Sequence, residues 1–229
     1  SADTGYASES SFGRIWKTTD GGINWSTITG MSMLGINSFV FMDGNTGWAV
    51  GMGGTILKTT NGGANWIQQT NPVTKQSLNS TFFTDSNTGY AVGNESTCLK
   101  TTNGGMNWVE LGSTRPWAPV CDLYSVSFIN TDTGYAVGGD KCPWTEAGVI
   151  FKTTNGGTDW VMVRDYVSLN LYSVHFPTSN VGYTVGNYGR ILKTIDGGSS
   201  WNSQISGIAN DLRSVFFTNA NTGYAVGNF

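Results

Sequence analysis

Five polar side chains that recur at one place in a repeated motif are the first candidates for chemistry in this sequence. The motif reads Lys-Thr-Thr-Asn-Gly-Gly-x-Asn-Trp in its clearest copies, Lys58–Trp66 and Lys100–Trp108. Carboxylate and amide oxygens can bind metal ions, and carboxylates can act as general acids or bases. A shared site would require these oxygens to converge. The five residues are Asp20, Asn61, Asn103, Asn155 and Asp196.

The two glycines after each of these residues indicate a different role. Asp or Asn before Gly-Gly strongly favours a tight turn. The short side chain can accept a hydrogen bond from the backbone of the following residues, and glycine readily adopts positive φ. Apolar and β-branched residues precede the motif, which predicts strand, tight turn, strand. Turns of separate hairpins cannot converge on one metal or substrate, so we expect a structural role for them and for the motif tryptophans. These tryptophans are Trp25, Trp66, Trp108, Trp160 and Trp201.

The numbers of histidines and of suitably spaced oxygen ligands limit the other kinds of catalytic or metal site. The chain has one histidine, His175, in a strand position that is Ser127 and Phe216 in sister repeats. This excludes a three-histidine metal site and gives a Ser-His-Asp triad no support. The turns Asp43–Gly47 and Asp85–Gly89 faintly resemble calcium loops but lack enough spaced oxygen ligands. We therefore expect no metal, no cofactor and no enzymatic activity.

Two further motifs alternate with the Gly-Gly motif and define the elements that position it. One is Thr-Gly-Tyr/Trp-Ala-Val-Gly, as at Thr88–Gly93, and the other is Leu-x-Ser-Val-x-Phe, as at Leu123–Phe128. Each unit predicts four short strands, A to D, and the motif tryptophans are spaced by 41, 42, 52 and 41 residues. This period predicts an all-β propeller of four-stranded antiparallel blades, with a solenoid as the competing repeat fold.

The motif counts bear on how a ring of blades would close. The Gly-Gly motif occurs five times and the strand-B motif six times. We expect residues 1–229 to form one domain of five blades, in which Ser214–Phe217 completes the blade begun by Ile15–Trp25. Two copies of strand B, Thr4–Ser8 and Thr222–Gly227, then compete for one position, and we expect the C-terminal copy to occupy it. The alternative is a fragment of a larger propeller, for example a seven-bladed one.

Composition excludes several partners. Charged residues make up 12% of the chain, the formal net charge is −3 and the pI is near 5. Nucleic-acid binding would require a basic stripe, so we expect none. No apolar run reaches the ~20 residues of a transmembrane helix, so we expect no membrane-spanning segment.

The repeat resembles known families at the residues quoted above. The pattern Ser/Thr-x-Asp/Asn-x-Gly-x-x-Trp after a strand is similar to the Asp-box (BNR) repeat of sialidases. The fuller unit, Gly-Tyr-Ala-Val-Gly to Asn-Trp, resembles the photosystem II stability/assembly factor family, which implies a propeller fold and partner binding through a basic patch. Sialidase chemistry would require an Arg-Ile-Pro segment, but only Arg14-Ile15-Trp16 and Arg190-Ile191-Leu192 come near it. The arginines are few and scattered, so a basic patch is not evident either.

The cysteines predict one disulfide. Cys121 lies just before strand A of its blade, and Cys142 lies in the B–C loop of the same blade. The D–A and B–C connections of an up-and-down blade emerge on the same face, so these two residues can pair. Such a bond would indicate an oxidising compartment. Cys98 occupies a strand position that is Ile56 and Ile191 elsewhere, which predicts a buried free thiol.

Function is expected where the repeat is broken. Two tryptophans, Trp117 and Trp144, lie in loops beside proline, and aromatic rings with charged neighbours suit recognition of a sugar or of a protein. The alternative is that both rings only cap the long insertion. The candidate binding residues are Trp117, Trp144, Arg115, Lys141, Glu146 and Tyr188.

The sequence thus favours a non-catalytic, extracellular or periplasmic propeller that binds a protein or glycan partner through its loop face. The first alternative is a photosystem II assembly factor-like chaperone in the thylakoid lumen, binding a membrane-protein subunit. The second is a sialidase-like glycoside hydrolase.

Overall fold

The computed structural model describes residues 3–9, 14–28, 35–69, 73–111, 120–140, 142, 148–167 and 169–228. The chain divides into two compact units. One comprises Ser1–Gly93 with Leu99–Glu110, and the other comprises Asn94–Cys98 with Leu111–Phe229. Within the described residues, both units are built from antiparallel β-strands joined by turns and three short 3-10 segments. None of these segments is a helix long and apolar enough to cross a membrane.

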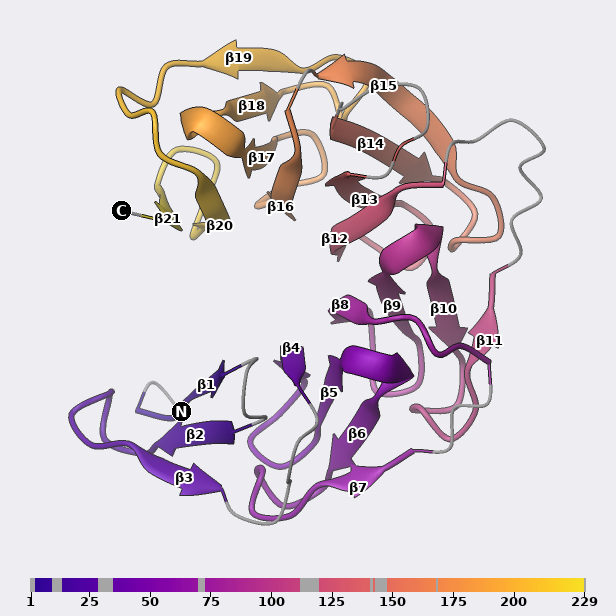
Figure 1. Ribbon diagram of the computed structural model, residues 1–229, viewed down its shortest axis with the longest axis vertical. Helices are drawn as coiled ribbons and strands as arrows, with labels where there is room; N and C mark the ends of the chain where they lie inside the picture. The colour runs from indigo at the N-terminus through magenta and orange to yellow at the C-terminus, as the bar shows by residue number, and fades with distance from the viewer. Residues whose placement is uncertain are drawn as a thin grey trace. The chain divides into compact units, whose positions relative to one another are not determined.

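The described residues of the first unit form three sheets, with strand orders β1-β2-β3, β4-β5-β6-β7 and β11-β10-β9-β8 (Figure 1). Strands β4 and β8 lie next to each other as the first strands of their sheets. The elements are β1 (Gly5–Glu9), β2 (Arg14–Thr18), β3 (Ser26–Ile28), β4 (Ile36–Phe41), β5 (Gly47–Gly51), η1 (Met52–Gly54), β6 (Ile56–Thr59), β7 (Ile67–Gln68), β8 (Leu78–Phe83), β9 (Gly89–Gly93), β10 (Cys98–Thr101) and β11 (Val109–Glu110).

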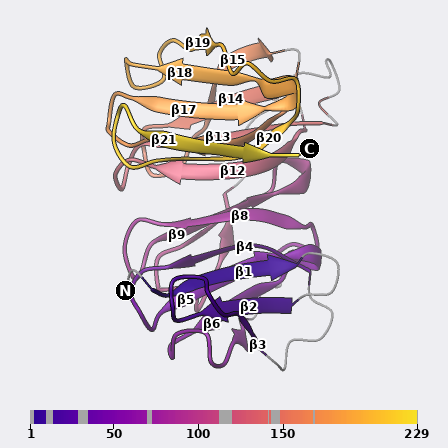
Figure 2. The same cartoon turned by 90° about the vertical axis from the view of Figure 1, so that its left-hand side faces the viewer.

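In the second unit, the part of the chain that is described also forms three sheets, with orders β12-β13-β14-β15, β16-β17-β18-β19 and β20-β21. Strands β12, β16 and β20 lie in sequence beside one another, and Figure 2 shows β20 and β21 of this unit face on. The elements are η2 (Asn94–Ser96), β12 (Asp122–Phe128), β13 (Gly134–Gly139), β14 (Gly148–Thr153), β15 (Val161–Val167), β16 (Leu171–His175), β17 (Gly182–Gly186), η3 (Asn187–Gly189), β18 (Ile191–Thr194), β19 (Asn202–Gln204), β20 (Leu212–Phe217) and β21 (Gly223–Gly227).

The Gly-Tyr-Ala-Val-Gly motif forms the second strand of each complete sheet and is buried along its whole length. A strand covered on both faces needs apolar residues at consecutive positions, which explains why the motif does not alternate with polar residues. Its glycines are required by close approach. A Cβ atom at Gly134 would lie 2.6 Å from the Phe128 ring, and one at Gly138 would overlap the carbonyl oxygen of Asp122.

The Gly-Gly turns share one hydrogen-bond pattern. In the turn after β14, the Thr153 hydroxyl donates to Asn155 Oδ1 at 3.0 Å and accepts from the Gly157 N–H at 2.9 Å. Asn155 Oδ1 also accepts from the Asp159 N–H at 2.9 Å. The same three bonds recur in the turns that contain Asp20, Asn61, Asn103 and Asp196. These side chains are therefore engaged within their own turns.

Neighbouring sheets are joined at the same turns. The Tyr135 hydroxyl of β13 and the Lys152 ammonium of β14 both donate to the carbonyl of Gly197 in the next sheet's turn. Tyr6 with Lys17 donates in the same way to Gly62, and Trp48 with Lys58 donates to Gly104. The serine of Leu-x-Ser-Val has a related role: Ser125 accepts from the Val174 N–H, and Ser173 accepts from the Val215 N–H. The repeated residues are thus accounted for by packing between sheets.

The expectation of four-stranded antiparallel sheets is confirmed, but one strand assignment was wrong. The position beside β2 is occupied by β1, the N-terminal copy of the strand-B motif, in register from Gly5↔Thr18 to Glu9↔Arg14. The C-terminal copy, β21, pairs with β20 instead. A copy that is only a few residues from its partner strand closes a short loop at low entropic cost, which favours the N-terminal copy.

The motif tryptophans differ in burial according to their sheet. Trp108 is 4% exposed and packs edge-on against Phe83 of its own sheet's first strand. Trp25 belongs to the three-stranded sheet and is 43% exposed. Trp48 of β5 is fully buried and stacks on Phe83 with ring centroids 3.8 Å apart.

Candidate ligand-binding site

Most of the loop residues expected to bind a ligand lie outside the described residues. These are Arg115, Trp117, Lys141, Trp144 and Glu146. The disulfide expected beside them is present: Cys121 and Cys142 are bonded, with Cα atoms 4.5 Å apart. Cys98 is buried as a free thiol, as expected. Tyr188 is described and is 69% exposed in η3.

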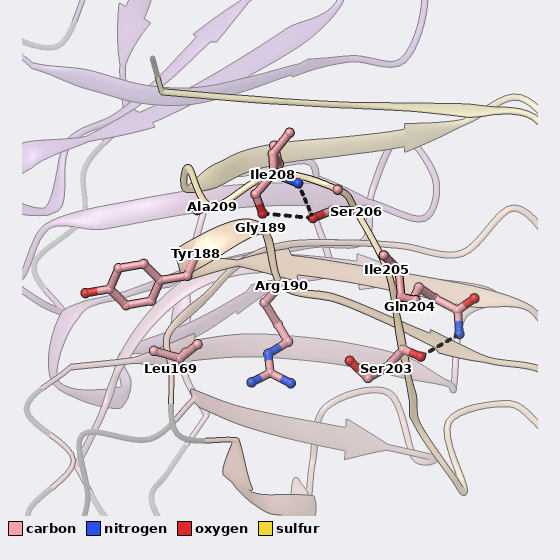
Figure 3. A pocket seen from close by; sticks show the side chains of 11 residues that line it. Leu169, Tyr188, Gly189, Arg190, Ser203, Gln204, Ile205, Ser206, Ile208 and Ala209 are labelled. Carbon is pink, nitrogen blue, oxygen red and sulfur yellow. Dashed lines mark hydrogen bonds between the residues drawn. The ribbon is translucent and has the colours of Figure 1, made fainter.

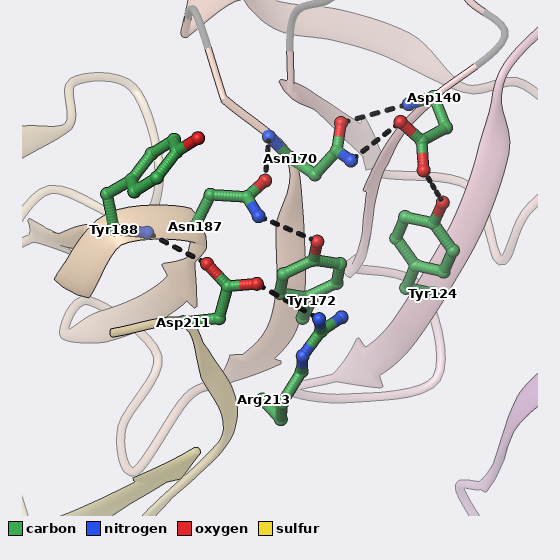
Figure 4. A network of polar contacts seen from close by, with 8 residues as sticks. All are labelled: Tyr124, Asp140, Asn170, Tyr172, Asn187, Tyr188, Asp211 and Arg213. Atoms are coloured by element: carbon green, nitrogen blue, oxygen red, sulfur yellow. Dashed lines mark hydrogen bonds and ion pairs between the residues drawn. The ribbon is translucent and has the colours of Figure 1, made fainter. Parts of the chain in front are cut away.

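A row of three side chains in the second unit forms the core of a candidate site. The residue after the buried leucine of strand A is Tyr124 in β12, Tyr172 in β16 and Arg213 in β20. The Arg213 guanidinium carbon lies 3.9 Å from the Tyr172 ring centroid, and the rings of Tyr172 and Tyr124 are 5.4 Å apart. We call these three residues the Tyr–Arg row (Figure 4).

Loop residues fix one end of the row. The Tyr124 hydroxyl donates to Asp140 Oδ2 at 2.8 Å, and the Asn170 side-chain amide donates to Asp140 Oδ1 at 2.7 Å. Asn170 Oδ1 in turn accepts from the Asp140 N–H at 3.0 Å. Asp140 lies just after β13 and Asn170 just before β16, so this pair joins the loops of two sheets (Figure 4).

The other end is fixed in the same way. The Asn187 side-chain amide donates to the Tyr172 hydroxyl at 2.8 Å, and Asn187 Oδ1 accepts from the Asn170 N–H at 3.0 Å. Asp211 Oδ2 forms a 3.0 Å ion pair with Arg213, and Asp211 Oδ1 accepts from the Tyr188 N–H at 3.1 Å. The row is therefore preorganised by a hydrogen-bond network that spans three sheets.

The electrostatics of the network suit binding more than proton transfer. Burial, followed by the hydrogen bond to Asp140, raises the pKa of the Tyr124 phenol well above its usual value. The Tyr188 N–H, then the Asn187 amide and the Arg213 charge, lower the pKa of Asp211. General acid–base catalysis favours groups whose pKa lies near the working pH. Both shifts move the pKa values of these groups further from pH 7. Tyr124 therefore stays protonated and remains a donor, and Asp211 stays a charged acceptor.

A cavity of about 600 Å³ adjoins the network at Tyr188. It is lined by Leu169, Tyr188, Gly189, Arg190 and residues 203–209 (Figure 3). Metal binding finds no support in the part of the chain that is described, where no three His, Cys, Asp or Glu side chains cluster.

Sequence reasoning missed the Tyr–Arg row. The candidates from the sequence were loop residues and tryptophans, whereas the row lies in strand A, one residue after a buried leucine. A signal was present, because the first unit has Asn37 and Asn79 at this position. The change from asparagine to tyrosine or arginine in three consecutive repeats is a departure from the repeat that a residue-by-residue alignment of the strands would reveal.

Comparison with known proteins supports the fold and a partial homology. No family model matches the chain. A stretch of 69 residues is 41% identical to photosystem II stability/assembly factor HCF136, chloroplastic, of Oryza sativa subsp. japonica. This match covers 29% of the chain and only 15% of that relative's length.

Solved structures are similar over nearly the whole chain. The structure of YCF48 bound to D1 peptide aligns with a TM-score of 0.56 at 19% identity, covering 100% of this chain and 88% of that one. YCF48 from Cyanidioschyzon merolae aligns with a TM-score of 0.57 at 15% identity, covering 98% and 93%. The GH74 xyloglucanase from Xanthomonas campestris aligns with a TM-score of 0.75 at 12% identity, covering 99% of this chain and 42% of that one. At these identities the likeness concerns the fold alone. The chain therefore has an all-β fold of the β-propeller type, and the 69-residue sequence match shows that a segment of it is homologous to a photosystem II assembly factor.

Proposed function

We propose that this protein is a non-catalytic binding propeller that holds a segment of a partner protein, as a photosystem II assembly factor-like chaperone does. The homologous 69-residue stretch and the likeness to a YCF48 structure that contains a D1 peptide support this function. They favour it over the extracellular protein- or glycan-binding role that we first expected. A peptide segment of a membrane-protein subunit is the partner we propose.

The observation that carries the proposal is the Tyr–Arg row. Tyrosine and arginine are enriched among the residues that dominate binding energy at protein interfaces. Here two tyrosines and one arginine are in contact across three strands and are held by loop hydrogen bonds. Side chains that are already ordered lose little conformational entropy on binding, so a preorganised row binds more tightly than a mobile one would.

A glycoside hydrolase is the second candidate, because GH74 enzymes share the fold. Such enzymes commonly require one carboxyl group whose pKa is raised. In the described site, Asp211 has a lowered pKa and is paired with Arg213. This supports a role for Asp211 in positioning Arg213 and argues against a role as general acid.

We also propose an oxidising location, either the thylakoid lumen or an exported compartment. The support is the Cys121–Cys142 disulfide, because such bonds persist in oxidising compartments and are rare in the cytosol.

The finer fold assignments remain predictions: the repeats are of the Asp-box type, and residues 1–229 form one domain of five blades. A single domain would unfold in one transition seen identically by tryptophan fluorescence and circular dichroism. Two separated transitions would argue against it.

The function is tested with synthetic peptides that tile the D1 protein, with binding measured by fluorescence anisotropy. We expect at least one peptide to bind the wild-type protein and to bind at least tenfold more weakly to Tyr172→Asn and Arg213→Asn. Asparagine is the natural residue at this position in the first unit, so these variants should keep the fold.

Two results would overturn the proposal. The first is that none of the tiled peptides binds. The second is measurable hydrolysis of xyloglucan by the purified protein, which would favour the glycoside hydrolase. A variant at an exposed lysine of the first unit, Lys75→Asn, serves as the matched control and should bind as the wild type does.

A further inference from the structure

The turn η3 differs from its sister turns at two positions that face one cavity. The equivalent residues are Gly53 and Thr55 in and after η1, and Glu95 and Thr97 in and after η2. The turn η3 has Tyr188 and Arg190 instead. The backbone bond is conserved in all three turns, since the N–H of Thr55, Thr97 and Arg190 each donates to the carbonyl three residues earlier. The two substitutions therefore change the surface of the turn and leave its fold intact.

Tyr188 is held in an unfavourable backbone conformation. Its φ is 51° and its ψ is 41°, the left-handed region that glycine adopts readily and that is rare for an aromatic residue. The equivalent Gly53 has φ 63°. The Asp211 carboxylate accepts the Tyr188 N–H and stabilises this conformation. The ring is 69% exposed, so burial does not offset the strain. Such strain is commonly found at functional sites.

Arg190 is a charge without a partner in the part of the chain that is described. The structure shows no hydrogen bond or ion pair from its guanidinium to a described residue. It lines the cavity beside Leu169 and Ser203 (Figure 3). Among the described residues that line the cavity, only Arg190 is charged. The carboxylate of Asp211 is not in the lining and forms its ion pair with Arg213. The cavity therefore favours an anion, and a guanidinium binds a carboxylate best, through two parallel hydrogen bonds.

The other lining residues are both polar and apolar. The apolar side chains include Leu169, Ile205, which is 99% exposed, and Ile208, which is 49% exposed. A Cβ at Gly189 would overlap the carbonyl oxygen of Ile208, so the turn and the loop are in direct contact. Ser206 Oγ accepts from the Ile208 N–H at 3.3 Å and stabilises the loop conformation. The volume lies in the range of ~300–1,000 Å³ that is typical of ligand pockets.

From these observations we infer that the Tyr188–Arg190 cavity binds a peptide carboxylate that lies beside an apolar side chain. Arg190 binds the carboxylate. The apolar side chain packs against Tyr188, Ile205 and Ile208. A peptide can present an apolar side chain next to a carboxylate, which matches the aliphatic residues beside Arg190, whereas a neutral sugar has no carboxylate for Arg190. The carboxylate can come from a chain terminus or from an Asp or Glu side chain. This inference deepens the proposed function and rests on it, because both require a peptide partner.

The test uses three short peptides and nuclear magnetic resonance titration of the full chain. The first is acetyl-Gly-Ser-Gly-Val-Ile with a free carboxylate, the second is its C-terminal amide, and the third is acetyl-Gly-Val-Glu-Ile-Gly amide. We expect the amide of the first peptide to bind at least tenfold more weakly than the acid. Stronger binding of the first peptide than of the third identifies a chain terminus as the source, and the reverse order identifies a side chain.

Two variants of η3 introduce the residues that occupy the equivalent positions of η1. Arg190→Thr should weaken binding of the acid roughly 10- to 100-fold, as expected for loss of a charge-assisted hydrogen-bond pair. Tyr188→Gly should also weaken binding while leaving the melting temperature unchanged or higher, since glycine relieves the strain at φ 51°. A purely structural role for Tyr188 would lower the melting temperature instead.

Three results would overturn this inference: equal binding of acid and amide together with no binding of the third peptide, unchanged binding by both variants, or binding of xyloglucan oligosaccharides alone. The row variant Tyr172→Asn separates the two proposals. If peptides from D1 bind through the row and these three peptides do not bind at all, the cavity inference fails and the proposed function stands. If neither set binds, both fail.

Discussion

The ammonium nitrogen of Lys152 lies 2.7 Å from the carbonyl oxygen of Gly197, the first glycine of the next sheet's turn. The Tyr135 hydroxyl donates to the same oxygen, and burial raises the pKa of Tyr135 to about 12, so it remains a donor. Lys152 also lies 5.6 Å from the Tyr135 ring centroid. One lysine therefore joins a strand, an aromatic ring and a neighbouring turn.

This contact predicts a stability effect for Lys152→Met. The charged hydrogen bond is lost while the aliphatic stem is kept, so we expect a loss of about 1–2 kcal/mol in the free energy of unfolding. Urea denaturation measures it, with Lys75→Met as the matched control because Lys75 is exposed. Equal stability of the two variants would show that the Gly197 contact contributes nothing.

The turn threonine predicts a second effect. Thr59 is 1% exposed, and its hydroxyl accepts from the Gly63 N–H at 2.9 Å. Thr59→Val leaves that N–H buried without an acceptor, so we expect a loss of about 1–3 kcal/mol by thermal or urea unfolding. Thr59→Ser keeps the hydroxyl and should retain most of the stability. A Ser variant as unstable as the Val variant would point to the methyl group instead of the hydrogen bond.

Replacing asparagine by aspartate should have opposite outcomes in two turns. Asn61→Asp introduces the residue that Asp20 and Asp196 already provide, and we expect stability near that of the wild type at pH 7. Asn155→Asp should destabilise the turn, because the Asn155 amide donates to Asp159 at 2.9 Å and a carboxylate would repel it. Comparing the two melting temperatures at low and high salt tests this, since salt screens the repulsion. Equal melting temperatures at low salt would contradict it.

His175 predicts a pH dependence. Its Nδ1 accepts from the Phe217 N–H at 3.2 Å, and burial lowers the pKa of His175 below 6.5. The unfolded chain then binds the proton more readily, so stability rises with pH in this window. We expect stability to be fully present above pH 6.5 and to be lost as the pH falls from there through the folded pKa.

The measurement is the free energy of unfolding at pH 7.5 and at pH 5. His175→Ser places the residue of Ser127 at this position and should remove this pH dependence. If the free energy of unfolding changes equally with pH in the wild type and the variant, other groups cause the pH dependence. Asp20 and Asp196, with pKa values lowered to about 2 by hydrogen bonds within their turns, act only in a lower window, below about pH 4.

The disulfide predicts the last effect. Cys121 and Cys142 are 21 residues apart in sequence, and a bond closing a loop of this size stabilises a fold by roughly 3 kcal/mol. Reduction should lower the melting temperature accordingly. Cys98 is buried, so iodoacetamide should not label it in the folded, oxidised protein. Labelling of Cys98 before unfolding would contradict its buried position.

Much of the fold could be predicted because its determinants are local. A Gly-Gly turn, a strand of Gly-Tyr-Ala-Val-Gly and a tryptophan three residues after the turn each act within a single hairpin. The Cys121–Cys142 bond was also predictable, since it follows from the order of strands in one sheet. The two copies of strand B show the limit: β1 and β21 have the same motif, and loop closure, which favours pairing with the nearer strand, decides between them.

The candidate site was decided by tertiary structure alone. Tyr124, Tyr172 and Arg213 are more than 40 positions apart in sequence, and each looks like an ordinary variation of its own strand. They meet because strands β12, β16 and β20 stand side by side, which brings the same position of three repeats into contact. The local patterns of the sequence determine each hairpin, because turn and strand preferences act between near neighbours. Packing between hairpins determines which of their side chains touch, because those contacts join residues of different repeats that no local turn or strand preference relates.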